Sequence, residues 1–237
     1  MRTFALGLFF CVAVMPAAHA GTITFIVPGT SNMWLAGMPA GSDGAWVDSA
    51  PGQSPVLTAG LNFAEGDILR FFATGAVTNG PCCAFEAPDG GAFTPALYAP
   101  ENGFANTTAP VNALMGVFLG PAQPDATPAP LGLDFITIGL DFAVLTPALK
   151  QVFFIGNGLT SGSTVQHFVV PIGATQLYLG TMDGFEWNNN MGEFRVDVTT
   201  PAPEPATLLL LGAGLASLRF GRKRFTTRKA PAATHQR

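Results

Sequence analysis

The sequence predicts an all-β protein, an antiparallel β-sandwich or jelly roll with long loops, together with an N-terminal signal helix and a short C-terminal transmembrane helix. Short apolar and β-branched runs recur between turn residues, and the chain holds 28 Gly and 20 Pro. Only 11% of its 237 residues are charged, and a helical bundle would need more Lys and Glu.

The first twenty residues are predicted to be a secretory signal peptide. Arg2 precedes an apolar run over residues 4–15, and Ala18-His19-Ala20 follows as a small-x-small cleavage site. An uncleaved anchor is the alternative, but the position of the site directly after the run favours cleavage behind Ala20. We therefore expect an extracytoplasmic domain over residues 21–200.

Seven segments of this domain have the composition of strands. They are residues 22–27, 68–74, 113–119, 151–155, 165–170, 176–179 and 194–199. In the last segment, apolar residues at 194, 196 and 198 alternate with charged residues, which is typical of a half-buried antiparallel strand. Residues 84–106 and 120–130 are predicted to be long loops over the sandwich.

The predicted domain is strongly acidic. Between residues 21 and 200 there are three basic and fourteen acidic residues, a net charge of −11. Such a domain repels nucleic acid and can attract a divalent cation, so no nucleic-acid partner is expected. An acidic, solvated surface is the alternative interpretation.

The C-terminal segment has three parts in a fixed order. Pro203-Glu204-Pro205 is followed by thirteen uncharged residues, 206–218, and then by basic residues that include Arg219, Arg222, Lys223 and Arg224. As a helix, the apolar run would be about 20 Å long, shorter than a full hydrocarbon core. The basic end is predicted to stay cytoplasmic.

This segment, residues 201–224, resembles the PEP-CTERM sorting tail. The resemblance implies recognition by an exosortase, a transient anchor in the inner membrane, and delivery to the cell surface or medium of a Gram-negative-type envelope. It also makes extracellular polysaccharide a partner by analogy. Residues 225–237 form a polar basic extension beyond the usual end of such tails.

Residues from about 55 to 199 resemble the PA-I-like galactophilic lectins, which are calcium-dependent β-sandwiches. Three segments carry the resemblance: residues 64–81, residues 112–120, and residues 173–194 with Asp183 and Asn188-Asn189-Asn190. The resemblance implies a calcium-supported carbohydrate-binding module.

Carried onto this chain, the calcium ligands implied by the resemblance are the carbonyl of Asn79 and the side chains of Asp183, Asn189 and Asn190. The loop is one residue shorter than in the family, and Glu186 stands near the position of the family's Thr. Glu186 could therefore be a substitute oxygen ligand, or Asn188 could replace Asn189 in register. Asp183 and Asn189 would also contact the sugar. An Asn-rich turn without metal is the alternative.

Trp187, beside this loop, is a candidate for stacking on a sugar, and a core position is the alternative. No His and Gln pair between residues 82 and 110 matches the sugar contacts of the family, so the resemblance does not imply galactose specificity.

The two cysteines outside the signal peptide, Cys82 and Cys83, are adjacent in the sequence. Their Cα atoms are about 3.8 Å apart, too close for ordinary disulfide geometry. A vicinal disulfide, intermolecular pairing and two thiols all remain open.

The sequence offers little for catalysis, and we expect no enzymatic activity. His167 is the single histidine between the signal peptide and the tail, and it lies in a predicted strand. Carboxylate pairs such as Asp134 and Asp141 carry no spacing signal for glycoside hydrolysis. A structural surface or matrix protein is the main alternative to a carbohydrate-binding module, and a secreted hydrolase is the third.

Overall fold

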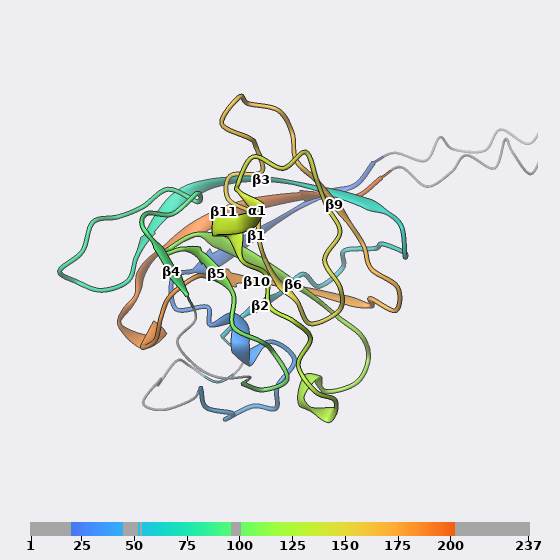
Figure 1. The fold of residues 1–237 in the computed structure, drawn as a ribbon, viewed down its shortest axis with the longest axis horizontal. Coiled ribbons are helices and arrows are strands. Elements are labelled where there is room, and N and C mark those ends of the chain that lie inside the picture. Colours follow the sequence, from blue (N-terminus) through green and yellow to red (C-terminus); the bar gives the residue numbers. More distant parts are fainter. Residues whose placement is uncertain (1–19, 45–51, 53, 96–100, 202–237) are drawn as a thin grey trace, which may run out of the picture. The chain divides into compact units, whose positions relative to one another are not determined.

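The computed structural model describes residues 20–44, 52, 54–95 and 101–201 (Figure 1). Ala20–Pro201 forms one compact unit. The predicted signal helix and the C-terminal helix lie outside the described residues. Within the described part no helix is long and apolar enough to cross a membrane, and α1, the longest, has four residues.

Two sheets make up the unit. The five-stranded sheet has the order β1 (Thr22–Pro28), β11 (Met191–Thr199), β3 (Ile68–Thr78), β9 (His167–Val169) and β7 (Val144–Leu145). The four-stranded sheet has the order β2 (Val56–Leu57), β10 (Gln176–Thr181), β6 (Leu114–Leu119) and β8 (Val152–Phe154). All pairings in both sheets are antiparallel except that of β7 with β9.

The remaining elements are short and lie in the connections. They are the small sheet of β4 (Phe93–Pro95) and β5 (Thr108–Pro110), the helix α1 (Phe135–Ile138), and the 3-10 turns η1 (Met33–Leu35), η2 (Pro124–Ala126) and η3 (Trp187–Asn189). The β4–β5 sheet falls partly within the segment predicted to be a loop over residues 84–106. Local composition did not indicate it, because each of its strands has only three residues.

A strand is present in each of the seven predicted segments, and the all-β, two-sheet architecture is confirmed. The narrower prediction of a jelly roll is not confirmed, since one sheet has five strands and includes a parallel pair. The predicted alternation in the last strand is confirmed, because Phe194, Val196 and Val198 are fully buried while Glu193 and Arg195 are exposed.

One apolar core takes residues from both sheets. Phe194 and Phe71 come from the five-stranded sheet, and Phe118 and Phe153 come from the four-stranded sheet. Phe118 and Phe153 are stacked with ring centroids 5.3 Å apart, and Phe153 also contacts Phe168 of the first sheet at 5.6 Å. Aromatic burial of this kind stabilises the face-to-face packing of the sheets.

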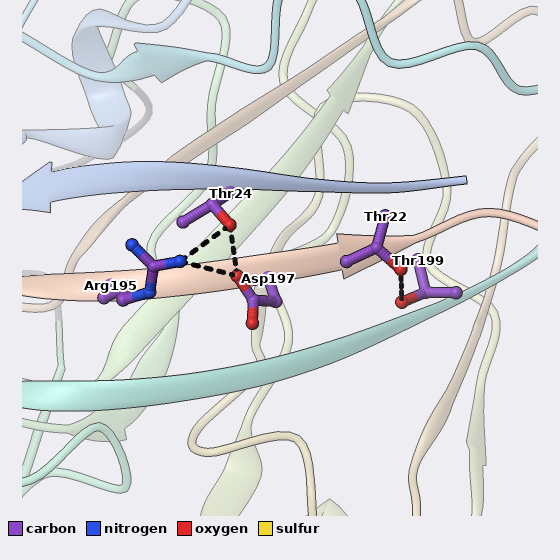
Figure 2. A network of polar contacts seen from close by, with 5 residues as sticks. All are labelled: Thr22, Thr24, Arg195, Asp197 and Thr199. Carbon is purple, nitrogen blue, oxygen red and sulfur yellow. Dashed lines mark hydrogen bonds and ion pairs between the residues drawn. The ribbon is translucent and has the colours of Figure 1, made fainter.

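Cross-strand polar contacts join the outer face of β1 to β11 (Figure 2). Thr22 lies opposite Thr199, and their hydroxyls are 2.9 Å apart. Thr24 donates to the carboxylate of Asp197 and accepts from the guanidinium of Arg195 at 3.2 Å. These contacts fix the edge strand that begins two residues after the predicted cleavage site.

The predicted loop over residues 120–130 contains η2 and is held by a lysine. The ammonium group of Lys150 donates to the carbonyl oxygens of Pro124, Thr127 and Pro128 at 2.8 to 3.0 Å. Lys150, one of three basic residues in the acidic domain, therefore satisfies three carbonyl groups of this Pro-rich segment. These bonds hold the segment in place although it has little regular secondary structure.

Candidate functional site

Two loops carry the predicted site residues. The Asn-rich loop, residues 182–190, connects β10 to β11 and holds most of them, and the loop with Asn79 follows β3. Because Thr78 pairs with Met191 at the end of the β3–β11 ladder, the two loops emerge from the same end of the sheet. A Cβ placed on Gly80 would lie 3.5 Å from Oδ1 of Asn189. The two segments that the resemblance assigns to one calcium ion are thus in contact.

Hydrogen bonds organise the second loop from within. Oδ1 of Asp183, a residue only 6% exposed, accepts from the Gly184 amide at 2.6 Å. Glu186 has a positive φ of 62°, and its carboxylate accepts from the side-chain amide of the exposed Asn189 at 3.3 Å. Asn188 is also exposed. Several of these groups therefore serve the turn, as the alternative interpretation of the sequence expects.

Asn190 has one satisfied and one unsatisfied side-chain atom. Its Nδ2 donates to the carbonyl of Gly29 at 3.1 Å, while its buried Oδ1 has no hydrogen-bond partner. A buried acceptor without a partner costs free energy unless another group compensates it. A cation or an ordered water at this oxygen would do so.

The donor set around this loop is poor in carboxylates. Among the described residues there is no group of three or more His, Cys, Asp or Glu side chains that could hold a metal ion. A calcium ion here would rely on Asp183 together with the amide oxygens of Asn189 and Asn190 and main-chain carbonyls. Such oxygens are ordinary calcium ligands, so the donor chemistry fits, although the charge is low.

The structure corrects the stacking role predicted for Trp187. Its side chain is only 2% exposed, its ring centroid lies 5.6 Å from that of Trp34, and its Nε1 donates to the carbonyl of Thr181 at 3.1 Å. A ring buried in this way has no free face for a sugar. The polar neighbours Glu186 and Asn188 made Trp187 a candidate for stacking, but the side chain takes the core position that was the alternative.

Cys82 and Cys83 lie in the neighbouring loop as exposed thiols with their Sγ atoms 3.0 Å apart. The hydrogen bond with Cys82 raises the pKa of the Cys83 thiol, with smaller contributions from desolvation, from the charge of Cys82 and from the Asp183 carboxylate. Gly80, two residues before Cys82, lies against Asn189, so the cysteines are close to the loop between β10 and β11. The thiol form of Cys83 is favoured at neutral pH.

This raised pKa predicts slow alkylation of Cys83. At pH 7.5, reduced protein should react with iodoacetamide at Cys83 more slowly than a model thiol, because only the thiolate attacks. A Cys82→Ala substitution removes the largest cause of the shift, so the pKa should fall and Cys83 should react faster. Mass spectrometry of the alkylated peptide measures the rate, and an unchanged rate in Cys82→Ala would contradict the assigned cause.

The sorting segment lies outside the described residues, so its evidence comes from comparison. Residues 201–224 match the PEP-CTERM protein-sorting motif. The match covers Pro203-Glu204-Pro205, the apolar run and the basic residues through Arg224, with the boundaries that the sequence predicts. It supports an exported protein with a C-terminal anchor that is processed by exosortase and sorted to the cell surface.

The β domain has no such support from comparison. A search of curated proteins found no match to this chain. The PEP-CTERM segment therefore identifies how the protein is sorted, and the resemblance of residues 55–199 to galactophilic lectins remains a prediction from the sequence.

The structure also contains a pocket that the sequence did not predict as a site. It has a volume of about 380 Å³, and no predicted metal or sugar ligand lines it. Of its lining residues, the sequence drew attention to Asp141 alone. Asp134, with which Asp141 was paired, instead caps α1 by accepting from the Ile136 amide at 3.0 Å. The segments that form the pocket are far apart in the chain, so only the fold brings them together.

Proposed function

We propose that this exported, exosortase-sorted surface protein binds extracellular carbohydrate with the help of calcium held at the loop of Asp183 and Asn190. The observation that carries the proposal is the contact between the loop after β3 and the loop before β11, which juxtaposes Asn79-Gly80 with Asn189. These are the two segments that supply calcium ligands in the lectins that the sequence resembles. The proposed role is binding and not catalysis.

The buried Oδ1 of Asn190 supports the proposal independently. It is an oxygen acceptor without a hydrogen-bond partner, seven positions from Asp183 in the same loop. The domain charge of −11 also favours accumulation of a divalent cation near the surface. Bound calcium would supply a positive charge that orients sugar hydroxyls, and Asn189, which is exposed, is the protein side chain best placed to contact them.

Calorimetric titration of calcium into the chelator-treated, full-length protein in detergent tests the proposal. We expect saturable binding with a dissociation constant of about 10⁻⁴ to 10⁻³ M, the range of extracellular calcium modules. Asp183→Ala should abolish the binding, because it removes the single carboxylate among the assigned ligands. Glu65→Gln, at an exposed position elsewhere, should leave it unchanged.

Asn189→Ala provides a second variant in case loss of the buried Asp183 perturbs folding. Because Asn189 is exposed, its truncation should weaken calcium binding without lowering the stability of the protein. The absence of binding in the intact protein would remove calcium from the proposal.

The second candidate is a structural surface protein without a small ligand. The hydrogen bonds that Asp183 and Asn189 make within their own turn favour it, since they show that both residues have a local structural use. It predicts no calcium binding, and it predicts that Asn189→Ala has no effect in the titration.

A further inference from the structure

We infer that the pocket formed by Asp89, Asp141 and the 156–163 loop is a second, calcium-independent binding site for a small neutral saccharide or similar polyol. This goes beyond the function proposed above, because it concerns a different site and does not require the Asp183 loop. The volume of the pocket, about 380 Å³, lies at the lower end of the range of about 300 to 1,000 Å³ for small-molecule sites.

Three separate parts of the chain build the pocket. Asp89 comes from the connection between β3 and β4, Asp141 from the connection between α1 and β7, and Phe154 from the end of β8. Six of its nine lining residues carry side-chain oxygen: Asp89, Asp141, Asn157, Thr160, Ser161 and Ser163. The other three, Leu140, Phe154 and Leu159, are apolar, so hydrogen-bonding groups and apolar surface converge in one cavity.

Both carboxylates are held in place by backbone. Oδ1 of Asp89 accepts from the Asn157 amide at 2.8 Å. Oδ1 of Asp141 accepts from the Ser161 amide at 2.6 Å, and Oδ2 accepts from the Ser161 hydroxyl at 2.7 Å. These bonds lower the pKa of Asp141, so it is ionised at neutral pH. Each carboxylate retains lone pairs that can accept from a ligand.

Gly156 lets a carboxylate and an aromatic ring share one wall. Its φ is +62°, and a Cβ at this position would lie 2.5 Å from both Oδ1 of Asp89 and Cζ of Phe154. Only glycine accommodates this close approach without displacement. The buried ring of Phe154 therefore packs against the Asp89 carboxylate from behind, and the half-buried Leu140 and Leu159 supply the apolar surface that a ligand can reach. Carboxylate and apolar surface in one cavity suit a sugar, whose hydroxyls and C–H groups lie side by side.

The charge of the lining selects the class of ligand. Two carboxylates and no cationic side chain line the pocket, so an anionic sugar or a phosphate would be repelled. A calcium ion fits poorly, because it needs six to eight oxygens within about 2.6 Å, whereas three of the four carboxylate oxygens already accept protein hydrogen bonds. A neutral polyol fits better than calcium, because it needs only to donate hydrogen bonds to the remaining lone pairs of these oxygens.

The test is saturation-transfer NMR followed by calorimetry on the full-length protein in detergent, with EDTA present. The probes are glucose, galactose, mannose, N-acetylglucosamine and their disaccharides, with glucuronic acid as the anionic comparison. We expect at least one neutral sugar to bind and glucuronic acid not to bind. Asp141→Asn should weaken the binding by about tenfold or more, because it removes a charged acceptor.

Asp141 is exposed, so Asp141→Asn should fold normally, and Asp89→Asn tests the opposite wall. Glu65→Gln is the matched surface control, and Asn189→Ala separates the two sites: it should weaken calcium binding and leave binding of the sugar in EDTA intact. The inference is overturned if no neutral sugar binds, if Asp141→Asn and Asp89→Asn bind as tightly as the parent protein, or if EDTA or Asn189→Ala abolishes binding.

Discussion

Replacing Pro203-Glu204-Pro205 with three alanines is expected to abolish delivery of the protein to the cell surface. The apolar run over residues 206–218 and the basic residues behind it remain, so the chain should still be exported and held at the inner membrane. What it loses is the part of the PEP-CTERM motif that precedes the apolar run. The full-length precursor should accumulate in the membrane fraction, as measured by cell fractionation and intact mass.

The basic residues offer a matched pair of variants. Alanine at Arg222, Lys223 and Arg224, inside the matched segment, should also impair sorting, because basic residues after an apolar segment keep that end on the cytoplasmic side. Alanine at Arg228 and Lys229, beyond residue 224, should have no effect if the exosortase reads only the matched segment. Normal surface delivery of the Pro-Glu-Pro variant would show that another signal sorts the protein.

The strands could be predicted from the sequence because burial imposes a local pattern on each of them. In β11, alternation places Phe194, Val196 and Val198 inward, and the period of two runs from Glu193 to the end of the strand. In β6, the run of apolar residues is buried throughout and is followed by Gly120. The β4–β5 sheet could not be predicted, since three-residue strands carry no periodicity.

Both candidate sites depend on contacts between residues that are far apart in the sequence. The contact between Asn79-Gly80 and Asn189 could be anticipated only through resemblance, because register between β3 and β11 sets it. No sequence pattern indicates the pocket of Asp89 and Asp141. Asp89 accepts a hydrogen bond from Asn157, which is 68 positions away in the chain. Gly156, which allows Asp89 and Phe154 to approach each other, cannot be told from an ordinary turn glycine in the sequence. The polar neighbours of Trp187 made it a candidate for stacking, whereas the structure gives it the core position that the sequence left as the alternative.

Trp187→Ala is expected to reduce the free energy of unfolding by about 3 to 5 kcal/mol, the usual loss when a buried aromatic side chain is truncated. The indole packs against Trp34 and is 2% exposed, so its removal leaves a cavity at the base of the Asn-rich loop. It also leaves the Thr181 carbonyl without the Nε1–H donor. Given total stabilities of about 5 to 15 kcal/mol, this loss is large.

Two further variants serve as controls. One separates the packing of the indole from its hydrogen bond, and the other tests a different aromatic residue of the same loop. Trp187→Phe keeps most of the apolar volume and loses the donor to Thr181, so it should cost about 1 to 3 kcal/mol. Phe185→Ala, at a side chain 42% exposed in the same loop, should change stability by no more than about 0.5 kcal/mol. Urea titrations followed by circular dichroism measure all three variants. If Trp187→Ala cost as little as Phe185→Ala, the indole would be a surface group, and its stacking on a sugar would again be the better interpretation.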